Sequence, residues 1–212
     1  MDGTIVDTEP AAAKAVLECF AGWGLQLEQE DARYVAGRTW SSAFEFLFRK
    51  YQLPISEEKA SHLIMERYRE ALALDLKRVP GSVEAIRSLV GHFKLALVSG
   101  SRRNEILWIL DKLEIRDCFQ VILGAEDYPH SKPEPDGFLK ALEMMKEDPA
   151  SGLVFEDSEA GIASGRAAGL WVVAVTSTNH FDYDLSGAHE KIRDLTGVTP
   201  AWISSLKLQN RS

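Results

Sequence analysis

The chain has 212 residues, 45% of them hydrophobic and 26% charged, which is typical of a globular protein with one large domain or a domain that carries an insertion. Its formal net charge of -8 argues against a broad nucleic-acid surface, because such a surface needs clustered lysine and arginine. No apolar run reaches membrane-spanning length and the N-terminus has no signal pattern, so we expect a cytoplasmic protein without a membrane partner.

Residues 9–78 follow a helical pattern throughout. Pro10 suits the first turn of a helix and Gly24 suits its C-terminal end, while Ser56 suits the N-cap of a later helix. The aromatic and methionine positions between these signals, Trp40 among them, are expected to pack inside a small helical bundle.

The pattern changes after residue 81, where short apolar runs alternate with helical segments. Four runs rich in Val, Ile and Leu are expected to be strands: KLALV, FQVIL, GLVF and WVVAV. Strands that alternate with helices predict parallel crossovers, and hence an α/β fold with a doubly wound parallel sheet. We therefore expect an α/β core formed by residues 1–8 and 79–212, with a helical cap domain inserted at residues 9–78.

Polar residues follow these strands at the edge where such a sheet presents a ligand site. Ser99 follows the first run, Lys132 comes after the second, and an acidic pair at residues 156–157 follows the third. Ligands of open parallel sheets bind at the carboxyl ends of the strands, so these groups are expected to converge with the turn at residues 2–4. Carboxylates suit Mg²⁺, whereas a lysine and a hydroxyl suit phosphate oxygens, so the set predicts phosphoryl-transfer chemistry.

The order of these motifs resembles that of the haloacid dehalogenase-like hydrolase superfamily, in its branch with a helical cap inserted after the first motif. The similarity covers nearly the whole chain. Four segments carry it: MDGTIVDTEP, LVSGS, SKPEPDGF and VFEDSEAGIASGRAAG. Each segment alone is a weak signal, but the four in this order at successive strand ends are specific. The resemblance implies a Rossmann-like core, a Mg²⁺ cofactor and activity on a small phosphorylated metabolite.

The resemblance also implies which residues hold the metal and move protons. Asp2 corresponds to the general acid/base, which protonates the leaving oxygen and then activates water, and its backbone carbonyl corresponds to a Mg²⁺ ligand. Asp157 corresponds to a second Mg²⁺ ligand, with Glu156 assisting directly or through water.

Further residues are expected to contact the substrate. Ser99, with Gly100 beside it, corresponds to the phosphate-binding loop, and Lys132 to the lysine that steadies the nucleophile and the phosphoryl charge. Arg38 lies in a cap loop that often faces the active site in this family, where it would grip a second anionic or hydroxyl-rich part of the substrate; a solvent-facing arginine is the alternative. Glu9 is either a substrate contact near the hinge or an acid at the start of a helix.

The expected nucleophile is the first Asp of the family's Asp-x-Asp motif, and Met1 occupies the middle position of that motif. We therefore expect the nucleophile and its strand to lie just upstream of Met1, and hydrolysis to pass through an aspartyl-phosphate intermediate. The 212 residues alone are expected to be inactive without it. If Met1 is the native start, a non-catalytic phosphate-binding protein is expected instead.

Other functions fit part of the pattern. A phosphosugar mutase shares all four motifs, but Ala11 and Ala12 stand where the β-phosphoglucomutase pattern has a His, which favours a phosphatase of sugar phosphates. A haloacid dehalogenase needs neither Asp2 as an acid nor the acidic pair at residues 156–157. A receiver domain with a phosphorylated Asp would have no helical insertion. We therefore expect a monomer that hydrolyses small phosphate monoesters with Mg²⁺.

Overall fold

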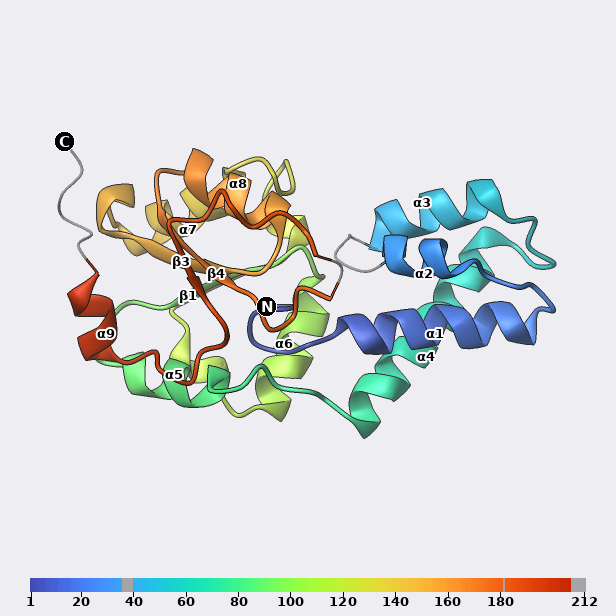
Figure 1. Ribbon diagram of the computed structural model, residues 1–212, viewed down its shortest axis with the longest axis horizontal. Coiled ribbons are helices and arrows are strands. Elements are labelled where there is room, and N and C mark those ends of the chain that lie inside the picture. The colour runs from blue at the N-terminus through green and yellow to red at the C-terminus, as the bar shows by residue number, and fades with distance from the viewer. Residues whose placement is uncertain (36–39, 181, 207–212) are drawn as a thin grey trace. The chain divides into compact units, whose positions relative to one another are not determined.

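The computed structural model describes residues 1–35, 40–180 and 182–206, and the chain divides into two compact units. The core unit comprises Met1–Val6 and Arg78–Ser212, and the helical unit comprises Asp7–Lys77 (Figure 1). The two divisions fall within two residues of the boundaries expected from the sequence.

The helical unit is made of helices whose ends follow the sequence signals. Pro10 lies in the first turn of the first helix, and the Ser56 hydroxyl caps the last one by accepting a hydrogen bond from the Lys59 N–H at 3.3 Å. The described helices of this unit are α1 (Glu9–Gly22), α2 (Gln29–Val35), α3 (Trp40–Lys50) and α4 (Glu57–Leu74).

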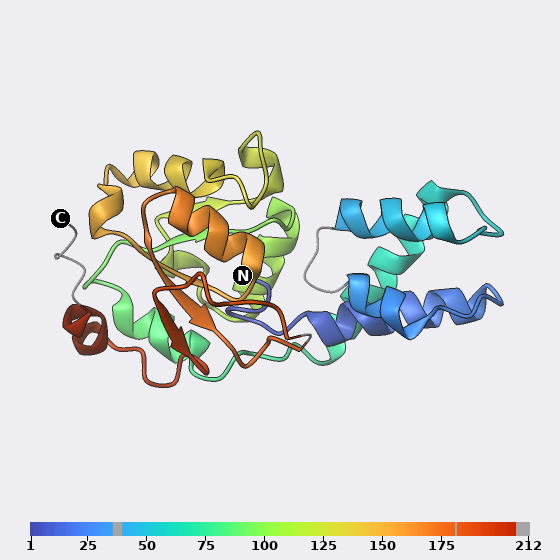
Figure 2. The same ribbon diagram turned by 45° about the horizontal axis from the view of Figure 1, so that its top comes forward.

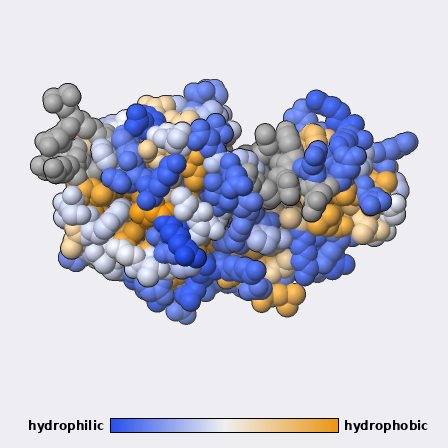
Figure 3. All heavy atoms as spheres, in the orientation of Figure 1, coloured by the Kyte–Doolittle hydropathy of each residue, from blue (hydrophilic) through white to orange (hydrophobic). Residues whose placement is uncertain are grey.

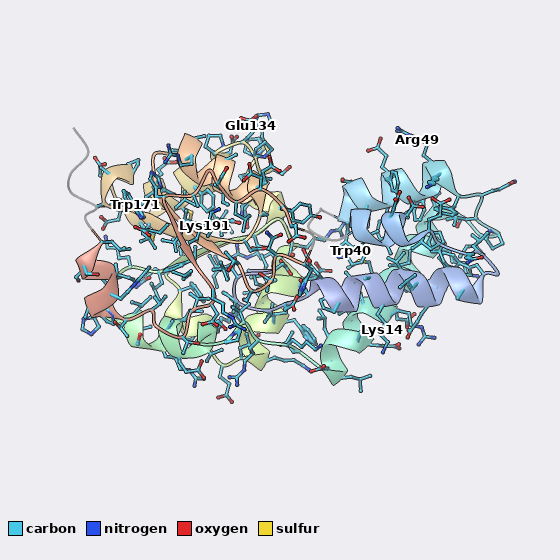
Figure 4. The ribbon with its side chains drawn as sticks, in the orientation of Figure 1. Lys14, Trp40, Arg49, Glu134, Trp171 and Lys191 are labelled. Atoms are coloured by element: carbon cyan, nitrogen blue, oxygen red, sulfur yellow. The ribbon has the colours of Figure 1, made fainter. Side chains whose placement is uncertain are left out.

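Apolar side chains of these helices form one core cluster. Phe20, Leu47 and Ile64 are fully buried in it. Trp40, labelled in Figure 4 at the start of α3, packs its ring against Phe44 and Tyr68 at centroid distances of 5.3 and 5.1 Å. Phe20 thus lies inside the bundle, whereas Trp40 and Phe44 are half-buried and pack against its buried cluster.

The core unit has an α/β fold with parallel strands, which confirms the predicted fold class. Strands β1 (Ala96–Val98) and β2 (Val121–Leu123) pair in parallel. Strands β3 (Leu153–Glu156), β4 (Trp171–Val175) and β5 (Glu190–Ile192) form a second parallel ladder in that order. Figure 4 labels Trp171 on β4 and Lys191 on β5. Among the described residues, β1 and β3 each pair on one side only, so the hydrogen-bonded ladder is in two pieces.

Helices connect the strands and cover both faces of them, with α7 and α8 on one side and α5 on the other (Figures 1 and 2). Val172 and Ala174 of β4 pack with Ile162 of α8, whereas Val175 packs with Leu89 of α5. This alternation along β4 is what a strand between two helical layers requires. The helices of the core unit are α5 (Ser82–Leu89), α6 (Arg103–Lys112), α7 (Asp136–Met145), α8 (Glu159–Ala167) and α9 (Pro200–Ser205), with short 3-10 turns at Arg116–Cys118, Ala125–Asp127 and Pro149–Ser151.

The surface mixes hydrophilic and apolar side chains, and hydrophilic residues cover much of the face shown in Figure 3. Within the part of the chain that the structure describes, every helix is too short or too polar to cross a lipid bilayer.

Candidate active site

The turn at residues 2–4 is folded tightly against the strand end that carries Asp157. Gly3 has a φ of +68°, a left-handed conformation that favours glycine, and its N–H donates to the Val6 carbonyl at 2.7 Å. A side chain at this position would also collide with its neighbour, because a Cβ on Gly3 would lie 1.8 Å from an oxygen of the Asp157 carboxylate. Glycine therefore lets the turn approach this carboxylate directly.

The Asp2 carboxylate is held by two hydroxyl groups from the loop after β1. Its Oδ2 accepts hydrogen bonds from Ser101 Oγ at 2.8 Å and from Ser99 Oγ at 3.2 Å. The Ser101 N–H in turn donates to Ser99 Oγ at 3.1 Å, which closes the turn around Gly100. Ser99 is only 2% exposed, so the loop presents a fixed pair of hydroxyls to Asp2.

Asp157 directly follows β3 and receives a hydrogen bond from the other side of the same turn. Thr4 Oγ1 donates to Asp157 Oδ1 at 2.9 Å. Burial, together with the negative charge of Glu156, raises the pKa of the Asp157 carboxyl to about 7, although the N-terminal ammonium group, Thr4 and Lys132 act in the opposite direction. Without a cation, this carboxyl is therefore about half protonated near neutral pH.

Lys132 and Glu156 form a buried ion pair beside Asp157. Their side chains are 18% and 7% exposed, and the ammonium group also donates to the Val98 carbonyl at 3.5 Å. Burial alone would lower the pKa of Lys132, but the charge and hydrogen bond of Glu156 outweigh it and hold the pKa above its ordinary value. The Glu156 carboxylate also accepts a hydrogen bond from Ser158 Oγ at 3.3 Å.

Short contacts join these groups into one cluster at the carboxyl ends of β1 and β3. Asp2 contacts Ser99. The carbonyl of Val98, the residue before Ser99, accepts a hydrogen bond from the ammonium group of Lys132. Thr4, two residues beyond Asp2, contacts Asp157, whose neighbour Glu156 binds the same lysine. The structure therefore places together the predicted core residues Asp2, Ser99, Gly100, Lys132, Glu156 and Asp157.

Two predicted substrate contacts lie elsewhere in the chain. Arg38 falls outside the described residues. Glu9 is the first residue of α1 and belongs to the helical unit. Both stay predictions as substrate contacts.

The acidic side chains do not form a metal cage by themselves. Across residues 1–35, 40–180 and 182–206, no three Asp, Glu, His or Cys side chains converge closely enough to hold a metal ion. Glu156 is bound by Lys132 and Ser158. A site with few protein ligands still suits Mg²⁺, which binds one or two carboxylates and completes its shell with water and substrate phosphate. Asp2, Glu156 and Asp157 stay a prediction as metal ligands.

Three hydroxyl groups that the sequence did not identify hold the site together. Ser101 binds Asp2, as described above. Tyr128 is buried, which raises the pKa of its phenol, and its Oη donates to the Ser99 carbonyl at 2.9 Å. Thr178 Oγ1 donates to the Gly3 carbonyl at 2.6 Å. Ser101 lies within a motif and could have been found from it, whereas Tyr128 and Thr178 lie outside the motifs.

Comparisons with known proteins find relatives over most of the chain. Residues 1–175 match the haloacid dehalogenase-like hydrolase family. The chain is 32% identical over 176 residues to the fructose-1-phosphate phosphatase YqaB of Escherichia coli (strain K12), which covers 82% of this chain and 93% of that protein. It is 30% identical over 200 residues to the bifunctional riboflavin kinase/FMN phosphatase of Arabidopsis thaliana, covering 93% of this chain but only 52% of that relative, about half its length.

A solved structure shows the same fold. The crystal structure of CbbY from Rhodobacter sphaeroides in complex with phosphate has a TM-score of 0.80 to this chain at 20% identity, and 93% of each chain is covered. Together with the matched motifs and the cluster of acids, lysine and hydroxyls at the strand ends, these findings show that the chain belongs to the haloacid dehalogenase-like hydrolase family.

Proposed function

We propose that this protein hydrolyses small phosphate monoesters with Mg²⁺, and that sugar phosphates are its substrate class. The observation that carries the proposal is the contact cluster at the ends of β1 and β3, where two serine hydroxyls, a buried lysine and the carboxyl groups of Asp2 and Asp157 come together. Such a set can neutralise and orient a phosphoryl group, which is most of what phosphoryl transfer requires. The similarity to a fructose-1-phosphate phosphatase supports the substrate class.

In this proposal, Asp2 moves the protons. Its carboxylate accepts hydrogen bonds from Ser99 and Ser101, so its orientation is fixed before substrate binds. A carboxyl group held at one position can donate a proton to the leaving oxygen and then accept one from the attacking water. We propose further that hydrolysis passes through an aspartyl-phosphate intermediate.

Ser99, Gly100 and Lys132 are proposed to bind the phosphoryl oxygens. The loop after β1 offers hydroxyls and backbone N–H groups, which suit phosphate oxygens. The raised pKa of Lys132 keeps its ammonium group charged at neutral pH, so it can stabilise negative charge as the phosphoryl group moves.

The carboxyl groups of this cluster fit Mg²⁺ by their chemistry. The Asp157 carboxylate and the Asp2 backbone carbonyl are proposed as hard oxygen ligands, and Glu156 is proposed to assist directly or through water. When bound, the ion would neutralise charge on the phosphoryl oxygens. The raised pKa of Asp157 also supports this role, because burial and the neighbouring charge of Glu156 disfavour its ionised form, which a cation would stabilise.

The helical unit is proposed to act as a cap. Glu9 and Arg38 are the proposed substrate contacts on it, and the chain crosses between the two units after residues 6 and 77. A cap that closes over the site would exclude water during the reaction and favour small soluble esters over phosphoproteins. This part of the proposal rests on fold analogy.

The experiment is release of inorganic phosphate from a panel of phosphate esters, with Mg²⁺ and with a chelator, using the chain and a form extended upstream. In the extended form we expect Mg²⁺-dependent hydrolysis that is lost in Asp2→Asn and Asp157→Asn and retained in Asp117→Asn, which changes an exposed aspartate outside the motifs. Isomerised sugar phosphate in place of inorganic phosphate would establish a mutase instead. Phosphate binding without turnover of any ester by the extended form would leave the non-catalytic alternative.

A further inference from the structure

Thr178 lies in a segment between β4 and β5 to which the sequence assigned no chemistry. The residue is 4% exposed, and its hydroxyl donates to the Gly3 carbonyl at 2.6 Å. The contact joins residues 175 positions apart in the chain and reaches the middle of the first motif. A buried hydroxyl that contacts a motif backbone needs an explanation beyond its own packing.

Gly3 is the pivot of that motif. Its N–H is bound by the Val6 carbonyl and its Cα faces the Asp157 carboxylate, so the contact with Thr178 fixes the remaining polar group of the residue. The side chains on either side of Gly3 reach in two directions, Asp2 to the serine loop and Thr4 to Asp157. A rotation of the Gly3 peptide would therefore move both contacts at once.

Hydrogen bonds hold the segment that contains Thr178 in place. The N–H groups of Thr176 and Ser177 donate to the carbonyls of Ile192 and Arg193, at 3.0 and 2.8 Å. Two residues further on, the Asn179 side chain donates to the carbonyl of residue 183 and accepts from its N–H, at 3.0 and 2.9 Å. The Thr178 hydroxyl therefore lies on a hydrogen-bonded turn at the carboxyl end of β4.

We infer that Thr178 is a positioning residue for phosphoryl transfer: its hydroxyl holds the Gly3 peptide so that Asp2 and Thr4 keep their contacts with the phosphate-binding loop and with Asp157. The inference rests on the proposed function. The segment after β4 then has a role in the site, because it supplies the hydrogen-bond donor that orders the first motif.

The test compares Thr178→Val, which keeps the branched shape and removes the hydroxyl, with Thr178→Ser, which keeps the hydroxyl. In the form of the protein that hydrolyses phosphate esters, we expect Thr178→Val to lower kcat about 10- to 100-fold, because small displacements of reacting groups have effects of that order. The KM should change less than about 3-fold, because the phosphate-binding groups are untouched. Thr178→Ser should keep most of the wild-type kcat.

Hydrogen exchange supplies a second readout that does not depend on turnover. Amides of residues 2–6 should exchange at least about tenfold faster in Thr178→Val than in the wild type or in Thr178→Ser, while peptides that cover β3 and β4 keep their rates. Wild-type kcat and exchange in Thr178→Val, or an equal loss in both variants, would overturn the inference. If the form extended upstream hydrolyses no phosphate ester, the proposed function fails, and exchange at residues 2–6 then decides for or against the role of Thr178 in ordering the motif.

Discussion

Gly161 gives the sharpest test of the packing behind the site, because helix propensity and local geometry predict opposite effects of the same substitution. It is the third residue of α8, and its N–H donates to the N-cap hydroxyl of Ser158 at 3.0 Å. Alanine in place of glycine inside a helix normally stabilises by up to about 1 kcal/mol. By propensity alone, Gly161→Ala should therefore raise the free energy of unfolding.

The structure predicts the opposite sign. A Cβ on Gly161 would lie 1.9 Å from Glu156 Oε2, whereas real Cβ atoms essentially never come closer than 3.0 Å to such a neighbour. The Glu156 carboxylate must therefore move by about 1 Å, and a shift of this size disturbs its ion pair with Lys132. Complete loss of one partner of a buried pair costs about 3–5 kcal/mol, so a partial displacement should leave a net loss of about 1–3 kcal/mol after the helix gain.

Urea denaturation followed by circular dichroism measures this difference. The matched control is Gly22→Ala at the end of α1, where an added Cβ would meet no atom within 4 Å and where we expect no loss of stability. The double variant Gly161→Ala with Glu156→Asp should lose less than the sum of the single losses, because the shorter carboxylate leaves room for the new methyl group. If Gly161→Ala matches the wild type or exceeds it, the close approach of Gly161 to Glu156 is wrong.

Four further predictions concern the titration, charge and hydrogen bonding of the site. Because the pKa of Asp157 is raised to about 7, protons compete with Mg²⁺ for this carboxyl below that pH. The Mg²⁺ affinity should therefore fall about tenfold per pH unit on acidification and level off above about pH 8. Thermal shifts with Mg²⁺ between pH 5.5 and 8.5 measure the affinity, and an affinity that does not change with pH contradicts the prediction. In the metal-free protein the pH dependence of stability runs the other way. The stabilisation by this carboxyl is full below its ordinary pKa of 3.8 and is lost as the pH rises through about 7. Asp157→Asn should therefore flatten the pH dependence of the free energy of unfolding. Lys132→Met keeps an apolar side chain against the Phe138 ring, whose centroid is 5.0 Å from the ammonium group, but leaves Glu156 buried without its cation. Denaturation should therefore show a loss of about 3–5 kcal/mol in the free energy of unfolding. A second substitution, Glu156→Gln, should restore part of this loss. Tyr128→Phe removes only the hydrogen bond to the Ser99 carbonyl and should cost about 1–3 kcal/mol; an unchanged unfolding midpoint would show that the bond does not contribute.

The strands and the motif residues could be predicted from the sequence because their signals are local. Val172 to Val175 form a continuous apolar run, and a strand buried between two helical layers needs such a run. Ser99 and Asp157 follow their strands directly, so the rule that ligands bind at carboxyl ends was sufficient to group them. The short strand β5 is a different case, since Glu190 and Lys191 are exposed and carry no apolar signal.

The contacts that hold the site could not be predicted because they depend on neighbours that are distant in sequence. Thr178 and Tyr128 are hydroxyl residues outside the motifs, and only the fold brings them to the carbonyls of Gly3 and Ser99. Glu126 and Asp127 show that position after a strand is not enough to identify an acid of the site. They follow a strand as the site acids do, but both bind Arg103, through its backbone N–H and its guanidinium group.

The distribution of charge in the cluster explains why so few protein ligands are needed for a cation. Glu156 and Asp157 are adjacent, and Lys132 is committed to Glu156 by the ion pair. The Asp157 carboxyl accepts a hydrogen bond from the Thr4 hydroxyl, and the positive charges of the N-terminal amino group and of Lys132 do not offset the effects of its burial and of the Glu156 charge. Protonation removes this excess charge near pH 7, and a divalent cation would remove it more effectively, because it also attracts the phosphate of a substrate. The burial of Asp157 beside Glu156 therefore supports the proposed affinity for Mg²⁺, which binds one or two carboxylates and completes its shell with water and phosphate.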